Sequence, residues 1–298
     1  AGKVAAKTLD MLTDYIKPGI STEKIDDLAY EFIKDNGGYS APQFYRGFKK
    51  SLCTSLNHVV CHGIPSDRIL EDGDVVNVDV TAVVNEYYGD TSRMFTIGNS
   101  SIKANNLIDA TYESMMKAIK ILKPGVKLGD IGNIIQNFVE EKGYSVVRDF
   151  CGHGISTTFH EPPNILHYGS RNSGPELKPG IKLGDIGNEI QSYVEEKGFS
   201  VVRDFCGHGI STTFHEQPNI LHYGTKNTGM ELKPGMTFTI EPMINAGKYD
   251  VKMLNDGWTA VTKDKSLSAQ FEHTIGITEN GYEIFTESAK GYSKPPYL

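Results

Sequence analysis

Apolar residues recur at helical spacing in several parts of the chain. In residues 22–36 the apolar stripe is formed by Ile25, Leu28, Ala29, Phe32 and Ile33. This spacing is typical of an amphipathic helix, and Ser21 or Thr22 can cap its start. The same pattern predicts helices over residues 106–122 and over the motif LGDIGNxIQxxVEEKG, which occurs twice.

Runs of β-branched and aromatic residues predict strands between these helices. Residues 75–84 alternate valine with polar residues, and residues 87–97 are expected to form the hairpin partner. Further strands are predicted in SVVRDF, in residues 236–243 and in residues 270–277. Because helices and strands mix and strand pairs lie close in sequence, we predict an α+β fold with a largely antiparallel sheet.

Residues 123–177 are followed at once by a near copy, residues 178–232. The units are 55 residues long and agree at 45 positions; most differences are mild, but Ile134 is replaced by Glu189. Two copies are too few for a solenoid, so we interpret them as a tandem duplication inside one domain that spans residues 1–298. The folded domain can use the first copy, the second, or a hybrid.

Composition narrows the class of protein. The chain has 298 residues, 39% of them apolar, and a net charge of −7, which argues against a general nucleic-acid binder. Apolar runs are shorter than the ~20 residues of a membrane span. The four cysteines form no CxxC pair and no leader segment is visible, so we expect a cytoplasmic protein.

Two acidic residues lie on the predicted hairpin, Asp79 within VVNVDVTAV and Asp90 on the partner strand. A turn at Val84-Asn85 places them directly opposite, with Cβ atoms about 4.5–5.5 Å apart, whereas a turn at Asn85-Glu86 makes them diagonal neighbours at roughly 7–8 Å. Carboxylates this close repel unless a cation or a shared proton lies between them. Two surface acids near a turn are the simpler alternative.

Other candidate ligands lie far away in the sequence. The motif GHGISTTFHE supplies His153 and His160, or in the second copy His208 and His215. Glu241 closes the apolar strand TFTIEPM, and Glu272 lies in SAQFEHT. Ion pairing explains any one of them alone. Together, two Asp, one His and two Glu suit Mn, Fe, Co, Zn or Mg, and carboxylates that can bridge suit a two-metal site.

At this point the motifs resemble type I methionine aminopeptidase, most like a bacterial form. The resemblance rests on CTSLNHVVCHGIP, VNVDV, GDTSRMF, GHGIS…FHE, TIEPM, DGWTAVTKD and SAQFEHT. It implies the pita-bread metallopeptidase fold, a curved and mostly antiparallel sheet covered by helices, here with one extra helix-strand repeat unit. It also implies removal of the initiator methionine from nascent proteins. The short stretch that usually precedes the AGKVAA helix, and the zinc-binding extension of eukaryotic forms, are not in this sequence.

The resemblance implies a ligand set and a mechanism. The ligands of two divalent ions (Co, Mn, Fe, Zn or Mg) would be Asp79, Asp90, one GHG histidine, Glu241 and Glu272. Asp79 would hold one ion, Asp90 and Glu272 would bridge, and the histidine and Glu241 would complete the other. A hydroxide shared by the ions would attack the carbonyl of the N-terminal methionine, with Glu241 also serving as general base.

Further residues are implied to contact the substrate. His62 would lie against it near the metals, and the histidine of FHE, His215 or His160, would stabilise the developing oxyanion. The methionine pocket would be lined by Tyr45, Phe48, Cys53, Trp258 and Phe214 (or Phe159). The partners would be nascent polypeptides beginning with Met, with a transient ribosome contact but neither a membrane nor a specific nucleic acid.

The choice between the copies favours the second, because it continues directly into TFTIEPM. We therefore expect His208 as metal ligand and His215 as oxyanion donor, with His153 and His160 as the first-copy alternatives. The other copy is then expected outside the fold, lowering stability. Two other functions stay open: a catalytically impaired or non-catalytic pita-bread protein, and a proline-specific peptidase of the same fold.

Overall fold

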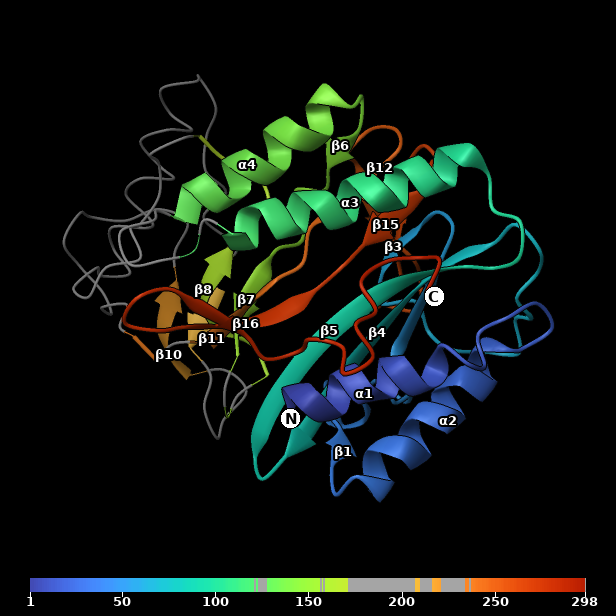
Figure 1. The fold of residues 1–298 in the computed structure, drawn as a ribbon, viewed down its shortest axis with the longest axis horizontal. Coiled ribbons are helices and arrows are strands. Elements are labelled where there is room, and N and C mark those ends of the chain that lie inside the picture. The colour runs from blue at the N-terminus through green and yellow to red at the C-terminus, as the bar shows by residue number, and fades with distance from the viewer. Residues whose placement is uncertain are drawn as a thin grey trace.

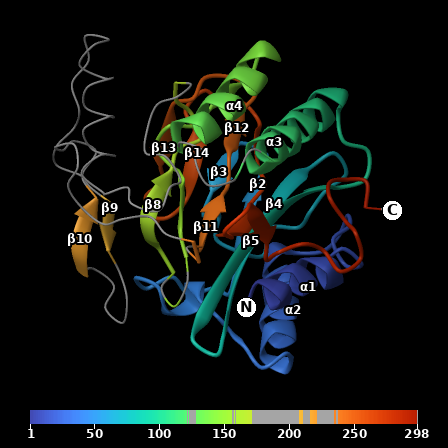
Figure 2. The same ribbon diagram turned by 60° about the vertical axis from the view of Figure 1, so that its left-hand side comes forward.

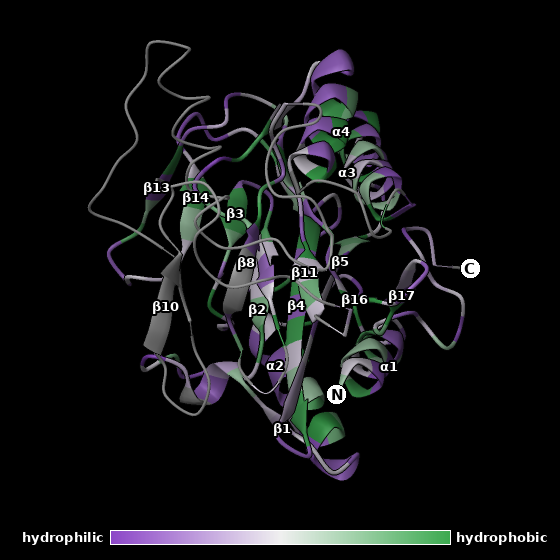
Figure 3. Ribbon diagram, turned by 90° about the vertical axis from the view of Figure 1, so that its left-hand side faces the viewer, coloured by the Kyte–Doolittle hydropathy of each residue, from purple (hydrophilic) through white to green (hydrophobic). Residues whose placement is uncertain are grey.

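Helices cover one side of a set of antiparallel strands (Figures 1 and 3). The computed structural model describes residues 1–120, 122, 128–155, 157, 159–170, 207–209, 216–220, 234–235 and 237–297. The helices are α1 (Gly2–Leu12), α2 (Thr22–Asp35), α3 (Ile102–Lys120) and α4 (Leu128–Glu141), with a 3₁₀ turn at Pro42–Phe44. Among the described residues, none of these helices combines the length and the apolar character that a membrane crossing requires.

The strands pair in two larger and three smaller sheets within the described ranges. The first larger sheet is centred on β4 and contains β1 (Tyr39–Ser40), β2 (Cys53–Leu56), β4 (Val75–Val84) and β5 (Tyr87–Thr96). The second has the order β17-β16-β11-β7-β8 and contains β7 (Gly152–Gly154), β8 (Glu161–Ile165), β11 (Thr237–Ile240), β16 (His273–Ile277) and β17 (Tyr282–Ile284). The smaller sheets have the orders β15-β12-β6, β13-β14-β3 and β10-β9.

Short strands make up the smaller sheets and connect the larger ones. They are β3 (Val59–Cys61), β6 (Ser145–Val146), β9 (Gly207–Gly209), β10 (Glu216–Ile220), β12 (Met243–Asn245), β13 (Val251–Met253), β14 (Ala260–Thr262) and β15 (Ser268–Gln270). Every pairing between named strands is antiparallel. The α+β prediction with a largely antiparallel arrangement is therefore confirmed.

The helical stripe predicted for residues 22–36 forms as expected. The Ser21 side chain accepts a hydrogen bond from the backbone N–H of Lys24 at 3.1 Å, so Ser21 is the cap. Ile25, Ala29 and Ile33 are fully buried. Burying an isoleucine side chain contributes about 1.5–3 kcal/mol, and burying the methyl group of alanine contributes about 0.8 kcal/mol.

Two apolar clusters anchor the helices to the strands. Helix α1 packs on β4 and β5, and α2 packs on α1 and β1, around residues such as Leu9, Leu12 and Val78. Helices α3 and α4 pack on β6, β12 and β15 around Ile131, Ile135 and neighbouring residues. Figure 3 shows the hydrophobic strand residues gathered beside helices that carry both hydrophobic and hydrophilic faces. The helices thus cover one face of the strands, and the candidate site lies on the opposite face.

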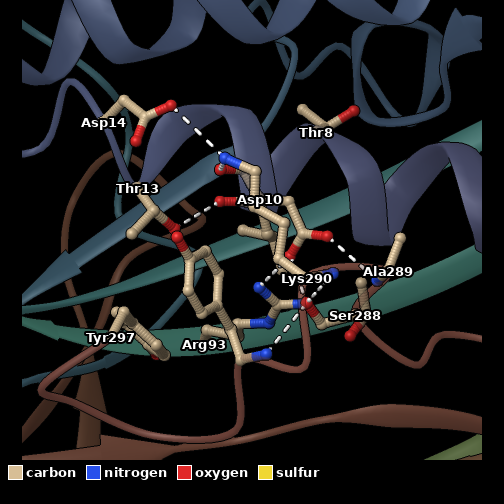
Figure 4. Close-up of polar contacts among 12 residues, drawn as sticks. Thr8, Asp10, Thr13, Asp14, Arg93, Ser288, Ala289, Lys290 and Tyr297 are labelled. Carbon is tan, nitrogen blue, oxygen red and sulfur yellow. Dashed lines mark hydrogen bonds and ion pairs between the residues drawn. The ribbon is translucent and has the colours of Figure 1, made fainter.

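The C-terminal segment is held against α1 and β5 by a buried polar cluster (Figure 4). Asp10 of α1 accepts hydrogen bonds from Arg93 Nη1 at 2.7 Å, from the Ser288 hydroxyl at 2.7 Å and from the Ala289 backbone N–H at 3.1 Å. Near the chain end, the Tyr297 hydroxyl donates to the Met94 carbonyl at 2.6 Å. One carboxylate therefore joins the first helix, a central strand and the last segment.

Several predicted elements have different bounds in the structure. The helix expected over residues 106–122 begins earlier, at Ile102. The strands expected over residues 236–243 and 270–277 are each broken in two, at Glu241-Pro242 and at Phe271-Glu272. At each break the chain passes from one sheet to another. Pro242 has no N–H to donate to a ladder, which accounts for the first interruption.

Candidate metal centre

Asp79 and Asp90 lie on the β4–β5 hairpin. Val84 pairs with Tyr87, so the turn is Asn85-Glu86, the second of the two alternatives considered from the sequence. Asp79 pairs with Ser92 and Thr81 pairs with Asp90, which makes the two acids diagonal neighbours on one face. The Thr81 hydroxyl donates to Asp90 Oδ1 at 2.8 Å and orients that carboxylate.

Glu241 and Glu272 lie at the two strand interruptions. Glu241 follows β11, and its backbone N–H donates to His167 Nε2 at 3.1 Å. Glu272 pairs with Ser92 of β5 by an isolated bridge, with N···O distances of 3.4 and 3.2 Å. Both carboxylates are buried. Leaving the regular ladder brings their side chains toward the hairpin acids.

The histidine of the site is His153 on β7. Gly154 pairs with Phe238, so β7 lies beside β11. A Cβ on Gly152 would lie 2.4 Å from the Thr239 carbonyl oxygen, so only glycine permits this approach. His153 Nδ1 lies 3.1 Å from the Gly154 carbonyl oxygen, which can only accept. Nδ1 therefore carries the proton, and Nε2 presents its lone pair to the carboxylates.

These side chains converge on one buried position. His153 Nε2 lies 3.8 Å from Asp90 Oδ2 and 3.5 Å from Glu241 Oε1. Ligand atoms of Asp90, His153 and Glu272 lie within 4.8 Å of one another. Asp79 Oδ1 and Glu272 Oε1 are buried without a hydrogen-bond partner among the described residues. Buried carboxylate oxygens normally have partners, so these two point to a ligand that accepts their lone pairs.

The electrostatics of the cluster agree with a cation. Burial raises the pKa of Asp79 to about 7. Burial and the neighbouring carboxylates raise the pKa of Asp90 and of Glu272 well above the ordinary range. Burial, and to a lesser extent Asp79, also raises the pKa of Glu241. A divalent cation among these carboxylates offsets both the cost of burying their charges and their mutual repulsion. The set of donor atoms therefore fits a metal centre.

A cavity of about 430 Å³ adjoins these side chains. Besides the acids and His153, it is lined by Tyr45, Phe48, Cys53, His62, Cys151, Phe159, His160 and Trp258. Tyr45 contacts Phe159 edge-on at a centroid distance of 5.2 Å, and Phe48 contacts Trp258 at 5.1 Å. His62 has φ 55°, which is uncommon outside glycine and is typical of a residue held by function or packing. One end of the cavity is thus apolar and the other carries the cluster.

The structure does not follow the preference for the second copy. His153 of the first copy joins Asp90 and Glu272, whereas β9, which carries His208, pairs with β10 within the described ranges. Figure 2 shows this pair beside β8 and separated by it from β11. His160 and Phe159 line the cavity, and their second-copy counterparts His215 and Phe214 lie outside the described residues.

The packing of helix α4 gives a physical reason for the place of the first copy. Helix α4 of the first copy follows α3 along the chain and packs against it. Ile134 of α4 is half-buried, and the second copy has Glu189 at that position. Placing a carboxylate there costs free energy unless it is paired. The replacement of Ile134 by Glu189 therefore favours the first copy as the one that packs against α3.

The polar residues that hydrogen-bond to Asp90 and Glu241 were not predicted. They are Thr81, Thr239, Gln270 and His167, which contact Asp90 or Glu241. A weak signal existed for three of them. Thr81 lies two residues from Asp79, Thr239 two from Glu241 and Gln270 two from Glu272. Residues two apart in extended chain share a face, so polar residues at this spacing accompany the ligands.

A buried set of four carboxylates and one histidine beside a cavity is the kind of donor set that a metal-dependent hydrolase uses. The model of metallopeptidase family M24 matches residues 1–180 and 175–279, two pieces that meet where the second repeat begins. Methionine aminopeptidase of Rickettsia prowazekii is 46% identical over 100% of this chain and 94% of its own length. The Escherichia coli K12 enzyme of the same name is 42% identical over 96% of this chain and 88% of its own.

Solved structures agree with these relatives. The crystal structure of methionine aminopeptidase from Rickettsia prowazekii matches with a TM-score of 0.74 and covers 96% of this chain and 94% of that one. The chain therefore belongs to the methionine aminopeptidases of family M24, which are metal-dependent hydrolases with the pita-bread fold. A prolidase from Pyrococcus furiosus, at 21% identity and a TM-score of 0.61, shares the fold alone.

Proposed function

We propose that Asp79, Asp90, His153, Glu241 and Glu272 hold two divalent ions, and that the adjoining cavity receives the N-terminal methionine of a polypeptide. The observation that carries this proposal is the convergence of ligand atoms of Asp90, His153 and Glu272 within 4.8 Å, beside buried oxygens of Asp79 and Glu272 that have no hydrogen-bond partner among the described residues. Four carboxylates offer enough oxygens for two ions, and some of them can bridge.

The positions of the side chains favour a division of ligands. Asp79 would hold one ion, His153 and Glu241 would hold the other, and Asp90 and Glu272 would be shared between them. When bound, the ions activate the attacking water and polarise the scissile carbonyl. The mixed oxygen and imidazole set accepts Co, Mn, Fe, Zn or Mg, so metal supply and measured affinity decide among them.

The remaining chemistry falls to residues of the chain. Glu241 takes the proton from the attacking water on a carboxylate oxygen and passes it to the leaving amine. His160, whose ring centroid lies 4.1 Å from that of His153, donates a hydrogen bond to the carbonyl oxygen as negative charge develops there. His62 lines the same cavity and contacts the substrate beside the cluster.

The apolar end of the cavity selects the side chain. Tyr45, Phe48, Cys53, Phe159 and Trp258 surround a space suited to an unbranched thioether, and aromatic rings make favourable contacts with sulfur. The natural substrates are then nascent polypeptides that begin with Met, in the cytoplasm and with a transient ribosome contact. Because the ligand cluster closes one end of the cavity, only the first residue of a chain reaches it.

Release of methionine from a Met-Gly-Met peptide tests the proposal. The full chain is stripped with chelator and assayed alone and with added Co²⁺ or Mn²⁺. We expect release only with metal, and a loss of at least about 100-fold in His153→Ala because a direct ligand is removed. His208→Ala is the matched control and keeps its activity. No release from the folded, metal-loaded chain would overturn the function, and loss only in His208→Ala would overturn the assignment to the first copy.

A further inference from the structure

Thr239 joins two side chains of the cluster through one hydroxyl group. It lies on β11, two residues before Glu241, and is fully buried. The backbone N–H of His153 donates to Thr239 Oγ1 at 2.7 Å, and the same Oγ1 lies 2.7 Å from Glu241 Oε1. Both distances are typical of strong hydrogen bonds.

The directions of the two bonds follow from the number of protons. A hydroxyl has one proton, and toward the His153 N–H it can only accept. A carboxylate that binds a metal only accepts, so the hydroxyl donates to Glu241. The orientation of Glu241 is therefore tied to the backbone of His153, and its Oε1 lies 3.5 Å from His153 Nε2.

β7 and β11 approach each other closely beside this hydroxyl. A Cβ on Gly152 would lie 2.4 Å from the Thr239 carbonyl oxygen and 3.2 Å from its Oγ1. The other ligands have separate supports. Thr81 orients Asp90, and Ser92 holds the backbone of Glu272. Removing the Thr239 hydroxyl is therefore expected to disturb His153 and Glu241 and to leave Asp90 and Glu272 in place.

We propose that Thr239 is a positioning residue that presents His153 and Glu241 as a pair to one of the two metal ions. This inference rests on the proposed function. Thr239 does not line the cavity and acts through the groups it orients. Hydrogen-bond partners behind metal ligands typically change metal affinity about 10–100-fold when they are removed.

Calorimetric titration of chelator-stripped full chain with Co²⁺ or Mn²⁺ tests the inference. In Thr239→Val we expect one of two metal equivalents to bind about 10–100-fold more weakly and the other to change by less than about 3-fold. Thr239→Ser restores both, since it keeps the hydroxyl. Thr239→Cys behaves like the valine variant, because a thiol is a weak donor and acceptor.

Thr237→Val is the matched control. Thr237 lies two residues away on the same face of β11, and its hydroxyl donates to the Ile155 carbonyl, away from the ligands. We expect the Thr237→Val variant to bind both metal equivalents with the affinities of the wild type. If the valine variant does not fold, the cysteine variant carries the test.

Three outcomes decide the matter. Wild-type affinities in the valine and cysteine variants would overturn the inference and leave the proposed function intact. Equal weakening of both equivalents would overturn it too, because the hydroxyl would then support the whole cluster rather than one ion. Failure of the wild-type chain to bind two equivalents would refute the two-ion proposal itself, and with it this role of Thr239.

Discussion

At the scale of single residues, His62 carries a protonation cost that links folding to pH. Its ring packs edge-on against Phe150 and Trp258, at centroid distances of 5.7 and 6.4 Å. Burial lowers the pKa of His62 to about 4. The unfolded chain binds this proton below about pH 6.5, whereas the folded chain does not until about pH 4. The stability that neutral His62 provides is therefore complete above pH 6.5 and is lost as the pH falls toward 4.

Urea unfolding of the metal-free protein at pH 7 and pH 5 measures this effect. In His62→Gln we expect the loss of unfolding free energy between the two pH values to be smaller than in the wild type by about 1–2 kcal/mol. His58→Gln is the control, because the His58 side chain is exposed, and it keeps the wild-type loss. An unchanged pH dependence in His62→Gln would contradict the lowered pKa of His62 as its cause.

The same scale shows what the sequence could predict of the site. Asp79, Glu241 and Glu272 stood out because carboxylates inside apolar strands need a reason to be there. Thr81 and Thr239 did not, because threonine is common in strands and a hydroxyl gives no sign of its partner. Which hydroxyl meets which carboxylate depends on strand pairing across many residues, and spacing along the chain does not contain that information.

At the scale of elements, the β4–β5 turn sets the register that makes Asp79 and Asp90 diagonal. Asn85 and Glu86 have φ of 51° and 68°, as a two-residue turn of type I′ requires. Asparagine tolerates this region, but glutamate is strained there by roughly 1 kcal/mol. Glu86→Gly removes the strain and adds some freedom to the unfolded chain. We expect a net gain of about 0.5 kcal/mol in the free energy of unfolding, measured by denaturant titration.

Asn85→Gly provides the comparison at the neighbouring position. Both side chains are exposed, so packing does not confuse the result. Since asparagine already tolerates positive φ, its replacement gives no gain. Equal gains at the two positions would contradict strain at Glu86 as the cause.

Element boundaries show where local pattern stops being informative. The hairpin was predicted closely because strand alternation and turn length are local properties. The strands through Glu241 and Glu272 were predicted as continuous, yet each strand changes sheet at or next to the glutamate. Alternation of apolar residues continues across such a break, so the pattern alone cannot show it. The break is nevertheless what brings each glutamate to the hairpin.

At the scale of the whole molecule, Asp10 and Arg93 join the two ends of the chain to the central hairpin. Both side chains are buried, with exposed fractions of 5% and 3%. Removing one partner of a buried ion pair leaves the other charge uncompensated. We therefore expect Arg93→Leu to lower the free energy of unfolding by about 3–5 kcal/mol, measured in urea.

The control for this pair is the exposed ion pair of Lys290 and Asp14, with an N···O distance of 3.4 Å, also drawn in Figure 4. Asp14→Asn is expected to change stability by no more than about 0.5 kcal/mol, because surface pairs are screened by solvent. Similar losses in both variants would mean that the buried cluster contributes no more than a surface contact.

The duplication makes its own prediction about the whole chain. Deleting residues 178–232 keeps α4, β7 and β8, which supply the packing and the cavity residues described above, and removes β9 and β10. We expect the shortened chain to bind the same two metal equivalents and to melt at a higher temperature than the full chain. The reason is that the second copy repeats the apolar pattern of α4 in its sequence, and apolar residues that are not buried by packing lower stability.

Deleting residues 123–177 instead gives a chain of the same length that differs at ten positions. This deletion places Glu189 at the position where the first copy has the half-buried Ile134. Burying part of a carboxylate there costs on the order of 1 kcal/mol or more. This second deletion should therefore melt below the first, and Glu189→Ile within it should recover the difference. A full chain as stable as the first deletion, or deletions of equal stability, would show that packing of α4 does not decide which copy the fold uses.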